Sequence, residues 1–276
     1  MLNDDDLQRY ARQVIMPDID EQGQQKLAAA KVLVIGAGGL GAPVILYLAA
    51  AGIGEITILD DDKVALTDLN RQIIYTMQDF GSSKASQAAA AVAQLNPVIN
   101  PVYIDARLTA DNAETLISAH DIIVDCSDNP ETRQLVGRTC HHMKRPLVFG
   151  GAVQLEGQIS VFQSGVEGYT DTPCFSCVFP AMPDAQQAPR CSQVGILGPV
   201  TGVIGAMQAL ETIKLCLGLG TNLTGRLVLF DGRDMRTMEI ATAKNPHCAC
   251  CGVQDHPAGA KPRPKDDRGQ SQLICI

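Results

Sequence analysis

Apolar runs of strand length alternate with longer stretches of helical composition through the first half of the chain. Val32–Ile35 is entirely apolar. Similar runs occupy residues 55–60, 102–106 and 121–126. Residues 7–30 are rich in Gln, Arg and Ala, whereas Lys84–Leu95 is rich in alanine and follows a serine that can cap a helix. Apolar strands that alternate with helices are typical of a mostly parallel sheet with helices on both faces.

The pattern changes after Pro146. Strand-like runs now follow one another with short turns between them, at residues 147–153, 158–163, 226–230 and 236–240. One long apolar helix, about Val200–Leu217, interrupts them. Strands joined by short turns indicate antiparallel pairing. We therefore predict an α/β fold, with a Rossmann-like, mostly parallel sheet followed by a mixed or antiparallel C-terminal half.

A glycine-rich turn joins the first predicted strand to the next helix. Its sequence is Gly36-Ala-Gly38-Gly39-Leu-Gly41, and Asp60 ends the second predicted strand. Glycines in this position let backbone N–H groups approach a phosphate, and the helix N-terminus adds positive partial charge. Asp60 could accept hydrogen bonds from both ribose hydroxyls. The motif predicts a nucleotide site but leaves NAD, ATP and a tight turn without a ligand as alternatives.

Polar side chains follow the second and fourth predicted strands. Asn70, Arg71 and Lys84 follow the second strand, and Asp128-Asn129 follows the fourth. Because the carboxyl ends of parallel strands line the crevice of an open α/β sheet, these side chains should meet there. A triphosphate needs cations on its oxygens and a carboxylate for Mg²⁺, whereas a hydride-transfer cofactor needs neither. This set favours ATP with Mg²⁺ on Asp128.

Ten cysteines are present, and most of them lie after residue 170. Cys174-x-x-Cys177 and Cys248-x-x-Cys251 each have a spacing at which both sulfurs can bind one Zn²⁺. Four thiolates would close the coordination shell and make the site structural, with a thiol–disulfide redox pair as the alternative. Cys191 follows Arg190, a cation that favours its thiolate.

The remaining cysteines divide into two groups. Cys126, Cys140 and Cys216 lie in apolar elements and are predicted to be core residues. For Cys250 and Cys275 the sequence suggests no role.

Net charge and apolar run length limit the partners. A net charge of −8 argues against nucleic acid, because an acidic surface repels phosphate. The apolar run Val194–Leu210 is shorter than the ~20 residues of a membrane span and predicts a buried helix. The first ten residues include three aspartates, which a secretory signal would not carry. We expect a cytoplasmic protein.

Together these motifs resemble one enzyme family. The sequence is similar to the ATP-dependent adenylyltransferases that activate ubiquitin-like sulfur carrier proteins: ThiF of thiamine biosynthesis, MoeB of molybdopterin biosynthesis and the adenylation domain of ubiquitin-activating enzymes. The matching segments run in family order from about residue 7 to 252. They are Arg9-Tyr10-x-Arg12-Gln13, the glycine motif, Leu59-Asp60-x-Asp62, Asn70-Arg71-Gln72, Lys84, Asp125-Cys126-x-Asp128-Asn129, Cys174-x-x-Cys177, Gly205-x-x-Gln208-Ala209-x-Glu211 and Cys248-x-x-Cys251-Gly252.

The resemblance implies an activity and its site residues. A carrier's C-terminal Gly-Gly carboxylate would attack the α-phosphorus of ATP, releasing pyrophosphate and forming an acyl-adenylate without a general base. A sulfur donor, a cysteine desulfurase or a rhodanese-like protein, would then form the thiocarboxylate. The residues implied at ATP and Mg²⁺ are Gly36, Gly38, Gly39, Gly41, Asp60, Asp62, Asn70, Arg71, Lys84, Asp128 and Asn129. Arg12 would enter the neighbouring subunit's site, which implies a homodimer, and Cys191 could bond covalently to the carrier.

The resemblance also sets the expected organisation. Residues 1–252 would form one adenylation domain, with a nucleotide-binding half to about residue 145 and a carrier-binding half with zinc at 146–252. Residues 253–276 contain three prolines among charges, and we expect a disordered tail.

The pathway has two interpretations within the family, and the sequence favours ThiF over MoeB. Segments 24–27, 189–191 and 229–232 look closer to ThiF and favour a thiamine sulfur carrier, whereas Asn245-Pro246-x-Cys248 looks closer to MoeB and favours the small subunit of molybdopterin synthase. Outside the family, an NAD-dependent oxidoreductase and an inactive carrier-binding module are the alternatives.

Overall fold

The computed structural model describes residues 2–180 and 194–252. A single eight-stranded sheet runs through this part of the chain in the order β3-β2-β1-β4-β5-β6-β7-β8. The strands are β1 (Lys31–Ile35), β2 (Glu55–Leu59), β3 (Asn100–Ile104), β4 (Ile122–Asp125), β5 (Leu147–Val153), β6 (Glu156–Phe162), β7 (Arg226–Asp231) and β8 (Arg236–Ala241). Neighbours from β3 to β5 are parallel and those from β5 to β8 are antiparallel, which confirms the predicted fold class.

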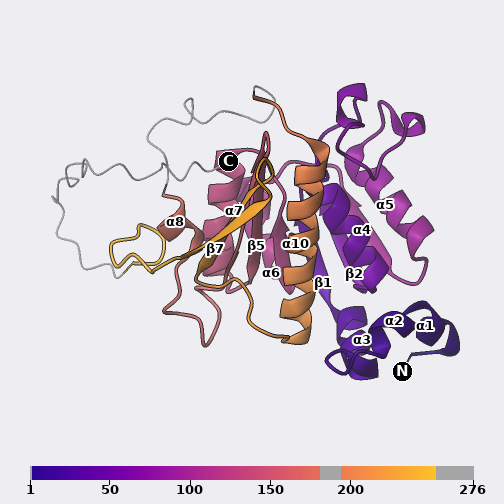
Figure 1. The fold of residues 1–276 in the computed structure, drawn as a ribbon, viewed down its shortest axis with the longest axis horizontal. Coiled ribbons are helices and arrows are strands. Elements are labelled where there is room, and N and C mark those ends of the chain that lie inside the picture. The colour runs from indigo at the N-terminus through magenta and orange to yellow at the C-terminus, as the bar shows by residue number, and fades with distance from the viewer. Residues whose placement is uncertain (1, 181–193, 253–276) are drawn as a thin grey trace.

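Helices cover both faces of this sheet (Figure 1). On one face lie α3 (Asp20–Ala29), α4 (Gly41–Ala51), α5 (Lys84–Leu95) and α10 (Gly198–Leu217); on the other lie α6 (Ala110–Ser118), α7 (Pro130–His142) and α8 (Phe175–Val178). Successive side chains of β1 point to opposite faces of the sheet. Val32 and Val34 pack into the core on the α4 face, and Leu33 and Ile35 pack into the core on the α7 face.

The predicted helix over residues 7–30 is wrong as one element. The segment forms α1 (Asp4–Arg9), α2 (Ala11–Val14) and α3, with a turn around Pro17. Tertiary contacts explain the break. The Tyr10 hydroxyl accepts a hydrogen bond from Asn96 Nδ2 at 2.8 Å, and Asn96 Nδ2 also donates to Ala49 O at the end of α4. The N-terminal segment therefore bends to cover the C-terminus of α4.

Helix α10 confirms the predicted apolar helix and begins two residues earlier than expected. Among the described helices it is the one long and apolar enough to cross a membrane by length and composition. It packs instead along α4, β5 and β6, where Ile204 and Gln208 are fully buried. It is a core helix of the fold.

Candidate nucleotide site and cysteine cluster

A cavity of about 310 Å³ lies at the carboxyl ends of β1, β2 and β4. In the sheet order β1 has β2 on one side and β4 on the other, so the chain reverses direction along the sheet at this point, where open α/β folds bind ligands. The predicted residues that line the cavity are Gly36, Gly38, Gly39, Asp60, Asp62, Arg71, Lys84, Asp128 and Asn129. The structure thus brings together side chains that the sequence separates by more than ninety positions.

Three glycines of the loop lie in different surroundings. Gly36 has a φ of +92°, a conformation that favours glycine. A Cβ on Gly41 would lie 2.0 Å from Gly36 O, so Gly41 lets α4 begin directly against the loop, although it does not line the cavity. A Cβ on Gly38 would meet only Gln72 Nε2, at 3.7 Å. No side chain accepts a hydrogen bond from the N-terminus of α4. The positive partial charge at that end of the helix can therefore favour a phosphate.

Asp60 is held by the backbone on both carboxylate oxygens. Oδ2 accepts from the Ala37 N–H at 2.7 Å and Oδ1 from the Asp62 N–H at 2.8 Å. Burial raises the pKa of Asp60 above its ordinary value, and these two N–H bonds oppose the rise. Each oxygen keeps a lone pair for another donor, so the carboxylate can still accept from a ribose.

The two cations past β2 are tied to carboxylates. Lys84 Nζ lies 2.9 Å from Asp62 Oδ2 and 3.6 Å from Asp68 Oδ2, and Arg71 Nη2 lies 3.3 Å from Asp68 Oδ1. Burial by itself would lower the pKa of Lys84, but the hydrogen bond to Asp62 and the other nearby carboxylates raise it above the ordinary value. Lys84 is therefore a charged amine held in a buried position.

The remaining predicted residues differ in their contribution. Asn129 caps α7, its side chain accepting from the Thr132 N–H at 2.8 Å, and Asp128 lies exposed beside it in the cavity wall. Asn70 is exposed and does not line the cavity; its side-chain oxygen accepts from Arg71 at 3.2 Å. Arg12 lies exposed on α2, outside the cavity. Cys191 and the tail 253–276 lie outside the described residues.

Two arginines in the cavity wall were not predicted. Arg107 follows β3, and Arg133 lies inside α7 with its guanidinium donating to Ser127 O at 2.7 Å and resting 5.3 Å above the Phe149 ring. The position of Arg107 three residues beyond a strand was a usable signal. Arg133 offered none, because a cation inside a helix is usually solvent-exposed.

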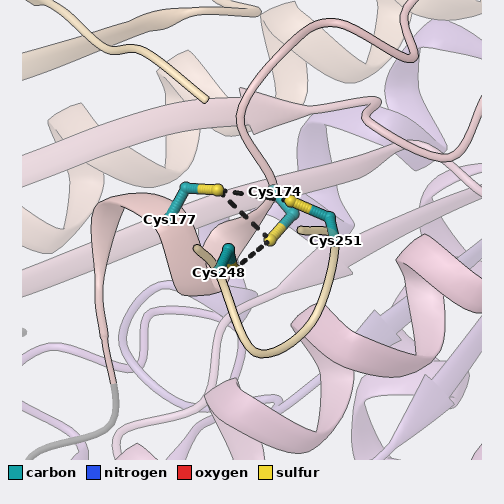
Figure 2. A group of neighbouring side chains, drawn as sticks. All are labelled: Cys174, Cys177, Cys248 and Cys251. Carbon is teal, nitrogen blue, oxygen red and sulfur yellow. Dashed lines mark hydrogen bonds between the residues drawn. The ribbon is translucent and has the colours of Figure 1, made fainter. Parts of the chain in front are cut away.

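A second group consists of four cysteines. Figure 2 shows the side chains of Cys174 and Cys177, at α8, converging on Cys248 and Cys251 from the segment after β8. All four sulfurs lie within 4.8 Å of one another. The Sγ–Sγ distances are 3.7 Å for Cys174–Cys177, 3.6 Å for Cys174–Cys248 and 3.3 Å for Cys177–Cys251.

This geometry fits tetrahedral zinc. With Zn–S distances of about 2.3 Å, the sulfurs of a tetrahedral site are about 3.8 Å apart. The backbone N–H groups of Asn245 and Cys250 point at Cys177 Sγ and Cys248 Sγ, at 3.4 and 3.5 Å, as donors that hydrogen-bond to metal-bound thiolates do. The cluster would join α8 to the segment after β8. Its four ligands would fill the coordination shell of the zinc and leave no position for a substrate or water.

Three other cysteines lie where the sequence predicts. Cys126 and Cys140 are buried in the two core clusters, and burial raises the pKa of both thiols. Cys216 packs against the first cluster, and burial raises its pKa to about 12. These thiols are unreactive core side chains.

Comparison with known proteins identifies relatives of this chain. It is 46% identical over 252 residues to "Adenylyltransferase and sulfurtransferase MOCS3" of Anopheles gambiae, covering 91% of this chain and 56% of that protein. The chain thus spans little more than half the length of that relative. It is 38% identical to "Sulfur carrier protein adenylyltransferase" of Thermus thermophilus, covering 90% of this chain and 92% of that protein.

Solved structures share the fold. A crystal structure of Escherichia coli MccB with MccA-N7isoASN matches with a TM-score of 0.75 at 22% identity, over 91% of this chain and 76% of that one. PaaA matches with a TM-score of 0.74 at 21% identity, over 88% and 76%. The model of the ThiF family matches residues 10–251, nearly the whole described chain. The chain belongs to the ThiF family.

Proposed function

We propose that this protein uses ATP to adenylate the C-terminal carboxylate of a small sulfur carrier protein, releasing pyrophosphate. The observation that carries the proposal is the cavity in which the glycine loop, Asp60 and the paired cations Arg71 and Lys84 meet, in a chain whose relatives include a sulfur carrier protein adenylyltransferase. A carboxylate is already a nucleophile, so the protein has only to position it against the α-phosphorus and neutralise charge.

The charges around the cavity support a divalent cation. Its lining includes four cationic side chains, Arg71, Lys84, Arg107 and Arg133, and five carboxylates, Asp60, Asp61, Asp62, Asp68 and Asp128. A site without excess positive charge would repel the phosphates of ATP unless Mg²⁺ accompanied them. Asp128, exposed in the wall, is the carboxylate we assign to Mg²⁺, which would neutralise phosphate oxygens.

The relatives favour a MoeB-like choice of carrier protein over a ThiF-like one. The adenylyltransferase and sulfurtransferase MOCS3 relatives reach 46% identity, and they favour the small subunit of molybdopterin synthase as the adenylated partner. The thiamine sulfur carrier, which the sequence motifs favoured, has less support from these relatives and becomes the second candidate.

Arg12 lies too far from the cavity of its own chain to reach it. The neighbouring Gln13 donates to Ala51 O at the C-terminal end of α4, whereas the cavity adjoins the N-terminal end. The 11 residues of α4 span about 16 Å, much more than an arginine side chain. Beside Gln13, Tyr47 and Leu210 line a largely apolar groove, and both are 57% exposed. We propose that a second copy covers this surface, giving a homodimer with composite sites.

Carrier-dependent exchange of labelled pyrophosphate into ATP tests the activity. Wild-type protein should catalyse exchange with a Gly-Gly-ended carrier, and Asp128→Ala should not. Offering both carriers in parallel tests the pathway, because the true partner should show the higher kcat/KM. Absence of exchange with every such carrier would overturn the proposed function.

Mixing two inactive variants tests the dimer. Arg12→Ala and Asp128→Ala chains that exchange at random place one intact site in each mixed dimer, so activity should return to about a quarter of the wild-type value. No recovery after mixing would contradict a composite site.

A further inference from the structure

Gln72 is a buried amide in the wall of the nucleotide cavity. It is 3% exposed, follows Arg71 in the loop after β2 and lies beside Gly38. Its backbone N–H donates to Asp68 O at 2.9 Å, and its own carbonyl accepts from Tyr75 N at 3.1 Å. The position of the residue is therefore fixed by the turn on both sides.

The orientation of this amide is also fixed. Gln72 Nε2 donates to Asp68 Oδ1 at 3.0 Å, and a carboxylate can only accept, so Nε2 rather than Oε1 must face it. Oε1 then finds no donor within the described part of the chain. A buried acceptor without a donor lowers stability, and such groups persist where a ligand supplies the missing hydrogen bond.

The space beside Gln72 suits a peptide backbone. Gly38 has no side chain and no atom but Gln72 Nε2 within 4 Å of its Cβ position. Next to it, a Cβ on Gly39 would lie 3.1 Å from the methyl group of Thr201, which also lines the cavity. The cavity is therefore open over Gly38 beside Gln72 and narrow at Gly39, which suits a substrate tail without side chains.

The second substrate can supply the missing donor. Phosphates of ATP carry no N–H group, and the glycine loop is where they would lie. An extended Gly-Gly tail carries an N–H next to its reacting carboxylate. We propose, on the basis of the function proposed above, that Gln72 Oε1 accepts a hydrogen bond from the N–H of the carrier's terminal glycine. This contact holds the carboxylate over Gly38 and selects a peptide tail.

The first test compares two buried glutamines. Gln72→Met keeps the length of the side chain and removes the acceptor. Gln163→Met is the matched control, because Gln163 is 5% exposed and Nε2 donates to Thr224 Oγ1 at 2.8 Å, at the far end of β6 from the cavity. In the exchange assay, Gln72→Met should raise KM for the carrier about tenfold and change KM for ATP less than about twofold. Gln163→Met should change neither, and thermal melts check folding.

The second test removes the N–H instead of the glutamine. A carrier made by ligation with glycolic acid as its last residue replaces that N–H with an ester oxygen. It should cost the wild type about tenfold in KM and Gln72→Met less than about twofold. Should Gln72→Met fail to fold, Gln72→Asn, which withdraws the oxygen by one methylene, takes its place.

The outcomes separate the two proposals. An equal cost of the ester in both proteins, or a rise in KM for ATP instead of the carrier, overturns the role of Gln72 and assigns its oxygen to the nucleotide or to water. No exchange by wild-type protein with the natural tail overturns the proposed function itself.

Discussion

Replacing Gly41 with alanine should separate the phosphate loop from helix α4. The new Cβ would lie 2.0 Å from Gly36 O and 2.9 Å from Gly36 C. Gly36 cannot move freely, because its N–H donates to Leu59 O at 2.8 Å and its φ is +92°. The overlap must therefore be relieved by moving α4, whose residues Val44, Ile45 and Leu48 are fully buried.

The size of the expected loss in stability follows from this geometry. Ordinary carbon–oxygen contacts are about 3.3 Å, so the backbone must move by more than an ångström. Overpacking of this kind costs about 3 kcal/mol, and alanine returns about 1 kcal/mol through its helix propensity. The net loss of about 2 kcal/mol should lower Tm by about 4–8 °C in a chain of this size.

Thermal melts and the exchange assay together check the reasoning. Gly38→Ala is the control, because its Cβ would meet only Gln72 Nε2 at 3.7 Å. Gly38→Ala should keep the wild-type Tm while raising KM for the carrier, whereas Gly41→Ala should lower Tm and raise KM for ATP. A Gly41→Ala protein with wild-type Tm and KM for ATP would refute this explanation of the glycine spacing.

Three further predictions follow from the ion pairs and the cysteine cluster. Protein purified without chelator should hold about one zinc per chain, and Cys251→Ser should lower both zinc content and Tm; less than about half an equivalent in the wild type, by elemental analysis, counts against the site. Lys84→Met should lower kcat for exchange by about 10²–10³, because it removes the buried cation that we propose acts on phosphate. A loss no larger than that of a surface lysine variant such as Lys26→Met would contradict that role. Burial raises the pKa of Asp60, so the ionised form that we propose to accept from the ribose is lost as pH falls through a value above that of an ordinary aspartate. KM for ATP should therefore rise towards acidic pH in the wild type and not in Asp60→Asn. Parallel pH profiles of the two proteins would exclude this assignment.

Local sequence was sufficient for the sheet and the glycine loop. Helix α5 (Lys84–Leu95) and strand β5 (Leu147–Val153) have the predicted boundaries, because a capping serine and a proline mark their ends. The predicted helix 7–30 overlooked one local signal, Pro17, which disfavours helix at the residue before it, but the contacts that fix the bend are not local. Tyr10, Gln13 and Gln24 are needed at the C-terminus of α4, where Gln13 and Gln24 donate to Ala51 O.

The site residues also divide into those that local sequence predicts and those that depend on tertiary packing. Asp60, Arg71, Lys84 and Asp128 could be named from their positions after strands, because parallel topology brings strand ends together. Arg133 could not, because its position depends on packing over Phe149, which follows it by sixteen positions and lies on strand β5. Arg12 could be named only from a resemblance, since one chain leaves it at the wrong end of α4.

Asp68 connects both cations that follow β2 with Gln72 in the wall of the cavity. Its Oδ1 accepts from Gln72 and Arg71, and its Oδ2 accepts from the Ala65 N–H at 3.0 Å and lies 3.6 Å from Lys84 Nζ. The carboxylate is 7% exposed, so these bonds form in an environment where electrostatic interactions are strong. One buried anion thus sets the positions of both cations proposed to act on phosphate and of the amide proposed to hold the carrier tail. Because these groups are oriented before any substrate arrives, little reorganisation would remain when charge develops on a phosphate, and the proposed adenylation would then need no general base.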